Sequence, residues 1–115
     1  MDRQTLLKTR ELPRERVTVP ELGEVWVRTL TAGERDEYEQ ECFHARAAST
    51  NDHVPNARAR LLVRTLCDAR GQALLTPADV DALGAQPIHV IQPLYNVAAR
   101  LNALTQQDRE ELEKN

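Results

Sequence analysis

The stretch from Ala57 to Leu104 constrains the fold most, because apolar residues recur along it at helical spacing. In its first part they occur at positions i, i+3, i+4 and i+7, namely Ala59, Leu62, Val63 and Leu66. In its last part the same spacing links Ile88, Ile91, Tyr95, Ala98 and Leu101. Such a pattern is typical of amphipathic helices that bury one face. It predicts two helices, at about residues 56–68 and 87–104, that pack against each other.

Between these two helices the sequence contains start and stop signals for shorter elements. A turn is expected around Gly71. Thr76 offers a hydroxyl cap, Pro77 is suited to the first helical position, and Gly84 is suited to a helix end, which predicts a short helix at 77–84. Pro93 lies inside the last predicted helix, where it removes a backbone hydrogen bond. We therefore expect a kink near residues 89–92 or a later helix start.

Before this helical region, the apolar period changes from helical spacing to two. Val17 and Val19 alternate with polar residues, and Val25 and Val27 do so after a connection that contains proline and glycine. This alternation predicts a β-hairpin at 15–29 whose valines face inward. Trp26 would then lie on the outer face. An exposed tryptophan either covers the edge of the core or anchors an interface.

A capping box at Thr31 and Glu34 predicts the start of a helix at about 32–48. Tyr38 and Cys42 share one side of it, and the other side carries a row of carboxylates, Glu34, Glu37 and Glu41. A charged row of this kind is typical of a solvated helix face. With a short final helix at 106–112, the prediction is a mostly α-helical small domain over residues 14–112. It has four to five helices and an N-terminal β-hairpin, and it follows a flexible segment at 1–13.

Length and composition exclude several classes of protein. The 115 residues suit one domain, and the net charge of -3 argues weakly against a protein that mainly binds nucleic acid. No apolar run approaches the roughly 20 residues that cross a bilayer. The start of the chain carries basic residues without an apolar run, unlike a secretory signal. We therefore expect a cytoplasmic protein, not bound to a membrane, with both cysteines reduced.

The sequence offers no pattern that indicates catalysis or metal binding. Cys42 could join His44, His53 and His89 in a metal site, but two positions apart on a helix Cys42 and His44 diverge by about 200°. The alternative is that Cys42 and Cys67 are buried and the histidines lie on the surface. Nucleophile motifs and phosphate-binding glycine loops are absent. We expect no enzyme activity, no catalytic residue, no metal and no cofactor.

Four arginines leave a second function open. Arg58, Arg60, Arg64 and Arg70 lie on or beside the helix at 56–68. They could contact phosphates, as in a small DNA-binding regulatory protein, or they could pair with the glutamate row of the preceding helix, which the acidic total favours. A helix-turn-helix over 77–104 is disfavoured, because Arg100 is its only arginine and Asp79 and Asp81 would oppose a phosphate backbone.

Three segments together resemble the tail assembly chaperones of long-tailed bacteriophages and prophages. They are Val17 to Asp36 (VTVPELGEVWVRTLTAGERD), Leu75 to Leu83 (LTPADVDAL) and Ala98 to Leu104 (AARLNAL), followed by a closing Glu-Lys-Asn. The resemblance extends over nearly the whole chain from about residue 14. The family carries a smooth alanine-rich helix where this chain has Pro87 and Pro93, so the geometry of that helix is expected to differ.

This resemblance implies a non-enzymatic role in building the phage tail within the host bacterial cytoplasm. Such chaperones coat the tape measure protein, keep it soluble and help to recruit tail tube protein, partly through a longer, frameshifted form. They are absent from the finished virion. The role implies self-association and no nucleic-acid partner. We expect partner contacts at Trp26, Tyr38, Leu94, Tyr95 and Leu101, with core packing as the alternative for the last four.

Overall fold

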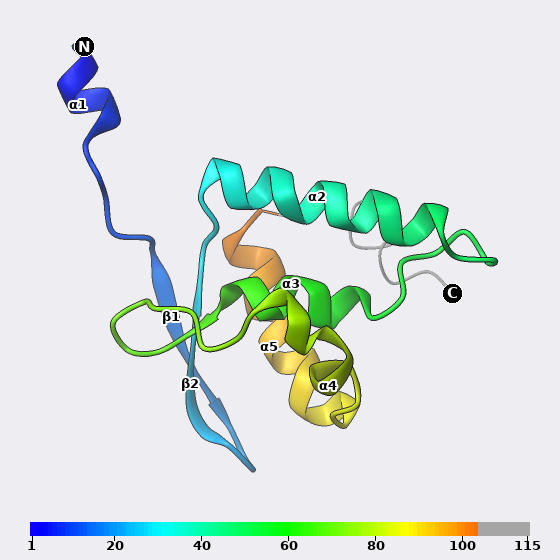
Figure 1. The fold of residues 1–115 in the computed structure, drawn as a ribbon. Helices are drawn as coiled ribbons and strands as arrows, with labels where there is room; N and C mark the ends of the chain where they lie inside the picture. The colour runs from blue at the N-terminus through cyan, green and yellow to red at the C-terminus, as the bar shows by residue number, and fades with distance from the viewer. Residues whose placement is uncertain (104–115) are drawn as a thin grey trace.

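The computed structural model describes residues 1–103, and over this range the chain is mostly α-helical with an N-terminal β-hairpin, as the sequence predicts (Figure 1). The predicted final helix at 106–112 lies outside the described residues. In chain order the elements are α1 (Arg3–Leu7), β1 (Arg14–Val19), β2 (Gly23–Arg28), α2 (Ala32–Ala47), α3 (Ala57–Thr65), β3 (Leu66–Cys67), a 3-10 turn (Pro77–Asp79), α4 (Val80–Gly84) and α5 (Ile88–Leu101).

The hairpin supplies two strands of a three-stranded antiparallel sheet with the order β1-β2-β3, in which β2 is the central strand. Its tight turn leaves Gly23 with a φ of 82°, a backbone conformation that glycine adopts without strain. The third strand corrects the sequence prediction of a helix over 56–68. That helix ends at Thr65, because Leu66 and Cys67 pair with Val27 and Trp26 of β2. Long-range strand pairing overrides the local helical pattern here.

The two faces of the sheet differ as the alternation predicts, but not completely. Val19 and Val27 are buried in the core, and Val17 and Val25 pack against it. Trp26 lies on the opposite face, as the alternation predicts, and its side chain is half-buried there. The guanidinium of Arg14 lies 5.7 Å from the centroid of the Trp26 ring. Its Nε also donates to a carbonyl of the loop that follows β3. This loop therefore covers part of the outer face.

The predicted helix starts at Thr31 and Thr76 are both confirmed as capping boxes, completed by Glu34 and Asp79. The helix that starts after Thr76 begins as a 3-10 turn and continues as α4. This helix ends at Gly84, as predicted, and Gly84 itself does not have a positive φ. A Cβ on it would overlap the side-chain amide of Asn56, so glycine permits this close approach rather than a special backbone angle.

Helix α5 passes through the centre of the core and is continuous across Pro93. It covers Ile88–Leu101, one residue later at its start and three residues shorter at its end than the predicted 87–104. Pro93 lies on the exposed side of the helix. On the opposite side, Leu94 and Tyr95 are fully buried against Leu61 and Leu62 of α3. The expected packing of these two amphipathic helices is thus confirmed.

Candidate interaction surfaces

The five residues expected to contact a partner occupy two different environments. Tyr38, Leu94 and Tyr95 are buried, with exposed fractions of 2% or less. Trp26 and Leu101 are half-buried. The burial of the first three favours the core-packing alternative, and of these Leu94 also contributes to the wall of a surface groove. Direct contact of the five residues with a partner stays a prediction.

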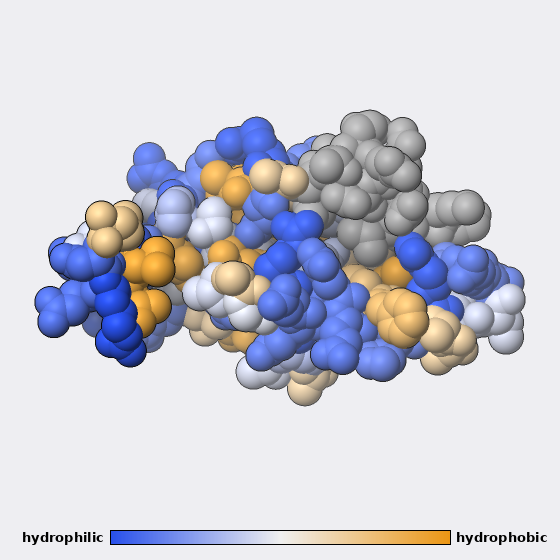
Figure 2. All heavy atoms as spheres, turned by 90° about the horizontal axis from the view of Figure 1, so that it is seen from above, coloured by the Kyte–Doolittle hydropathy of each residue, from blue (hydrophilic) through white to orange (hydrophobic). Residues whose placement is uncertain are grey.

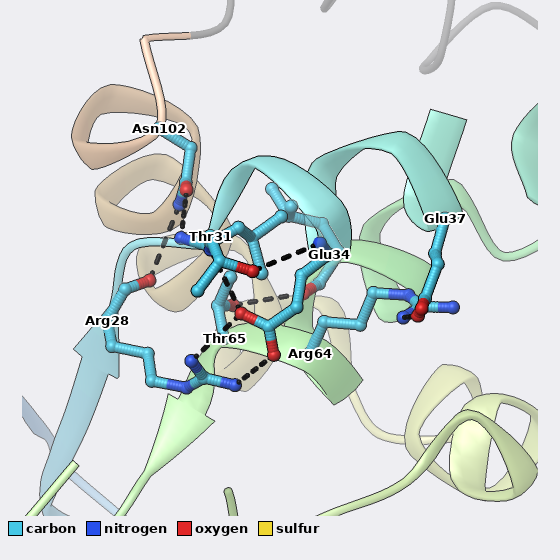
Figure 3. Close-up of polar contacts among 9 residues, drawn as sticks. Arg28, Thr31, Glu34, Glu37, Arg64, Thr65 and Asn102 are labelled. Carbon is cyan, nitrogen blue, oxygen red and sulfur yellow. Dashed lines mark hydrogen bonds and ion pairs between the residues drawn. The ribbon is translucent and has the colours of Figure 1, made fainter. Parts of the chain in front are cut away.

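A polar cluster joins the end of the hairpin to the start of α2 and to the end of α5. Asn102, just after α5, accepts a hydrogen bond from the backbone N–H of Leu30 at 2.8 Å. Its Nδ2 donates to the carbonyl of Ala98 at 2.9 Å and lies 3.4 Å from the carbonyl of Arg28. Arg35 of α2 donates to the Asn102 carbonyl. Figure 3 shows Asn102 beside the chain between β2 and α2, which it holds against α5.

Beside this cluster, Arg28 and Glu34 form a bidentate ion pair. Both terminal nitrogens of Arg28 donate to the carboxylate of Glu34, at 3.2 Å and 3.0 Å (Figure 3). Burial by itself would raise the pKa of Glu34, but the hydrogen bonds from Arg28 and from the Thr31 backbone outweigh it and lower this pKa. The Arg28 side chain is only 8% exposed. The pair therefore gives the buried charge of Arg28 a counter-charge at the start of α2, although the Arg28 Nε has no hydrogen-bond partner among the described residues.

The arginines of α3 pair with the carboxylates of α2, as the structural alternative predicts. Arg60 contacts Glu41 at 2.9 Å, and Arg64 contacts both Glu37 and Glu41. Arg58 instead donates to Gln92 of α5. The charges of the two helices are thus largely matched within the chain. This arrangement leaves α3 without the unpaired basic face that phosphate binding requires.

An apolar groove of about 460 Å³ opens between the hairpin tip, the loop after β3, α4 and α5. Aliphatic side chains from all four elements line it, and Asp79 and Gln86 are the polar residues in its wall. Leu22 and Leu74 are 55% and 58% exposed there, although both are large and apolar. The lining aliphatic residues are Leu22, Val25, Leu66, Leu74, Leu75, Ala82, Leu83, Val90, Ile91 and Leu94. Grooves of this chemistry accept the apolar face of a helix.

Sequence reasoning missed both the groove and the role of Asn102. The groove combines side chains from distant segments, so no local pattern reveals it. A usable signal did exist, because the segments that carry the family resemblance meet in these places. Asn102 belongs to the segment 98–104 and its partners to the segment 17–36. Residues of the segment 75–83 form one wall of the groove.

Other chemistry is limited in the part of the chain that the structure describes. Within residues 1–103, no group of three or more His, Cys, Asp or Glu side chains could hold a metal ion. No described helix is long and apolar enough to span a membrane. Cys42 and Cys67 are both buried free thiols, as predicted, and burial raises the pKa of each. Neither has the lowered pKa of a reactive nucleophile.

Comparison with known proteins assigns the chain to a family. The fold is similar to that of the tail assembly chaperone of bacteriophage HK97, with a TM-score of 0.57 and 21% sequence identity, over 85% of this chain and 97% of that one. A comparison with curated proteins gives no match. The sequence model of the phage tail assembly chaperones matches residues 3–115. Since this match covers almost the entire chain, the protein belongs to the phage tail assembly chaperone family.

Proposed function

We propose that this chaperone binds the tape measure protein of its phage, and that the apolar groove is where it does so. The observation that carries the proposal is the exposure of Leu22 and Leu74 at the rim of a groove lined almost entirely by aliphatic side chains. An amphipathic helix can place its apolar side chains in such a groove without strict demands on sequence. That property suits a chaperone that covers many segments of one long helical protein.

Bound in this way, several copies would cover apolar surface of the tape measure protein and keep it soluble in the host bacterial cytoplasm. The chaperone would help to recruit tail tube protein, mainly through a longer, frameshifted form, and would leave before the virion is finished. Self-association between neighbouring copies belongs to the same proposal. These steps are supported by membership of the family rather than by individual contacts.

The DNA-binding alternative has less support. Arg60 and Arg64, which would have to contact phosphates, are 19% and 14% exposed and are held by Glu37 and Glu41. Binding to a phosphate backbone would require these ion pairs to break and would place the carboxylates near it. The structure of α2 and α3 therefore favours a protein partner.

Co-expression tests the proposal. The chain is expressed together with the tape measure protein of the same phage, and each is also expressed alone. We expect a soluble complex that co-purifies, and a tape measure protein that is less soluble without the chaperone. Leu74→Asp places a charge in the groove and should abolish co-purification. Phe43→Asp is the matched control, because Phe43 is 69% exposed and lies outside the groove. Equal binding by both variants would exclude the groove as the binding site.

A further inference from the structure

Helix α1 projects from the body of the molecule and buries none of its residues (Figure 1). Leu6 and Leu7, its two leucines, are each 61% exposed. Figure 2 shows apolar atoms beside hydrophilic ones towards the left end of the molecule. We refer to residues 1–7 as the arm. Its two leucines belong to neither core cluster and do not line the groove.

The arm has a defined helical shape despite its exposure. Asp2 caps its first turn by accepting from the N–H of Thr5 at 2.8 Å, and this bond lowers the pKa of Asp2. Arg10 closes the other end by donating to the carbonyls of Thr5, at 2.7 Å, and Leu6. A five-residue helix is marginal in water without tertiary contacts. An apolar surface that accepts Leu6 and Leu7 would therefore stabilise the arm.

The groove is complementary to the arm in charge as well as in polarity. The arm and the linker that follows it, residues 1–13, carry the basic residues Arg3, Lys8 and Arg10 against the acidic residues Asp2 and Glu11. Asp79 lies in the wall of the groove, and Glu21 and Glu24, which form ion pairs with His89 and Arg16, lie on the hairpin beside Leu22 and are 62% and 59% exposed. A basic helix with two leucines fits a groove with an aliphatic floor and an acidic edge.

The arm of the same molecule is poorly placed to fill this groove. The arm joins the body at the start of β1, whereas the hairpin tip with Leu22 lies beyond the far end of that strand (Figure 1). A six-residue strand spans about 20 Å. The linker of residues 8–13 covers at most about 20 Å when fully extended. It would have to run straight back along β1, whereas the arm of a neighbouring molecule has no such constraint.

We propose that the arm of one copy occupies the apolar groove of a second copy, with Leu6 and Leu7 against Leu22 and Leu74, until a tape measure helix displaces it. The second part rests on the proposed function, which assigns the groove to the tape measure protein. Because arm and groove are different surfaces, the contact is heterologous. If two copies each place their arm in the groove of the other, a closed dimer results. If each copy places its arm in the groove of the next, the contact continues along a chain of copies. In both arrangements the chaperone shields its own groove before its client is present.

Sedimentation of the full chain over a range of concentrations tests the contact. The wild type is expected to self-associate, and the double variant Leu6→Asp, Leu7→Asp to do so at least about tenfold more weakly, because two charges replace the apolar contact. The arm buries nothing within its own molecule, so thermal unfolding of this variant should match that of the wild type. A monomeric wild type, or a variant that associates as the wild type does, would overturn the proposal.

Mixing two variants tests which surfaces meet. The arm variant keeps an intact groove, and Leu74→Asp keeps an intact arm. Neither should self-associate alone, but together they should form a mixed complex in which the arm of the Leu74→Asp chain enters the groove of the other. Replacing the Leu74→Asp chain by one that carries Leu6→Asp, Leu7→Asp and Leu74→Asp should prevent this complex. Failure of the two single-surface variants to combine would refute the contact between arm and groove.

The same variants separate this inference from the proposed function. The arm variant should still bind the tape measure protein, and at lower concentration than the wild type, because no arm competes for the groove. If it binds the tape measure protein exactly as the wild type does, displacement of the arm is refuted while client binding stands. If the wild type and the arm variant both fail to bind while arm exchange is observed, the proposed function fails and the contact between copies stands.

Discussion

The carboxamide of Asn102 accepts a hydrogen bond from the backbone N–H of Leu30, 72 residues earlier in the chain, at a distance of 2.8 Å. The same side chain donates to the carbonyl of Ala98 within its own helix end. Asn102 thus connects the hairpin to α5. Leu30 lies between β2 and α2, so its backbone N–H has no hydrogen-bond partner within a helix or strand. Replacing Asn102 leaves half-buried backbone groups without a hydrogen bond.

We expect Asn102→Ala to lower the free energy of unfolding by about 1–3 kcal/mol, the usual cost of leaving buried polar groups unsatisfied. Asn96→Ala is the matched control, since Asn96 is an exposed asparagine on the same helix and surface substitutions usually change stability by less than about 0.5 kcal/mol. Urea unfolding of both variants measures the difference. Equal stability of the two would mean that the contacts of Asn102 do not contribute.

The ion pair between Arg28 and Glu34 predicts how stability depends on pH. The pKa of Glu34 in the folded chain is below its ordinary value of 4.5. A carboxyl with a lowered folded pKa stabilises the native state above its unfolded pKa, and this contribution is lost as the pH falls through the folded value. The free energy of unfolding should therefore decrease below about pH 4.5.

Glu34→Gln should show a smaller decrease over the same pH range, and at neutral pH it should be less stable by about 2 kcal/mol, because Arg28 is left buried without its counter-charge. Glu39→Gln is the control, since Glu39 forms an exposed ion pair with Arg35. Urea unfolding at a series of pH values makes the comparison. A Glu34→Gln chain with the full acid dependence of the wild type would assign that dependence to other carboxylates, such as Asp68, whose pKa is also lowered.

Because Asn56 lies so close to Gly84, the effect of Gly84→Ala on stability should depend on the residue at position 56. Alanine is normally about 1 kcal/mol better than glycine within a helix. At Gly84 its Cβ would meet the Asn56 side chain and displace Nδ2 from its 3.1 Å hydrogen bond with Asp81. We therefore expect Gly84→Ala to destabilise the wild type. In an Asn56→Gly background, which tolerates the φ of 54° at that position, the same change should stabilise.

A double-mutant cycle with thermal or urea unfolding measures this coupling. Additive effects of Asn56→Gly and Gly84→Ala would contradict the steric explanation. Gly33→Ala provides the matched control, since a Cβ there meets nothing within 4 Å. That change should have the same small effect with Asn56 or with glycine at position 56.

Burial of both thiols predicts slow chemical modification of the folded chain. Cys42 and Cys67 are 8% and 1% exposed, and burial raises both pKa values, so little thiolate is present at mildly alkaline pH. Ellman's reagent should react slowly with the native protein and rapidly with two thiols in denaturant. Phe43→Cys should add one thiol that reacts rapidly in the native state, because position 43 is exposed. Rapid reaction of the native wild type would contradict the burial of the two cysteines.

The features that the sequence predicts correctly are those set by short segments. The capping boxes at Thr31 and Thr76 each need only four residues, and the inward valines of the hairpin follow from simple alternation. Pairing of Arg60 and Arg64 with the glutamates of α2 is also confirmed, although it joins two helices, because each helix carries its charges in a row along one face.

The features that the sequence does not predict depend on distant segments. Leu66 and Cys67 continue a helical pattern, and only the presence of β2 beside them makes them a strand. Gly84 has the position of an ordinary helix end until Asn56, 28 residues earlier, is placed against it. The candidate partner residues show the same limit, since Tyr38 and Tyr95 carry large, mainly apolar side chains, which are common both in cores and at interfaces.

The position of Asn102 has a consequence for how the protein folds during synthesis. The ribosome makes the hairpin, α2 and α3 first. Asn102, which accepts from Leu30 through its side chain and from Arg35 through its backbone carbonyl, is among the last described residues to be added. A nascent chain that stops short of Asn102 lacks this connection, and one that stops before α5 lacks Tyr95 and most of the apolar surface on which the hairpin packs. Completion of the native fold must therefore follow translation of nearly the whole described chain, rather than proceed element by element from the N-terminus.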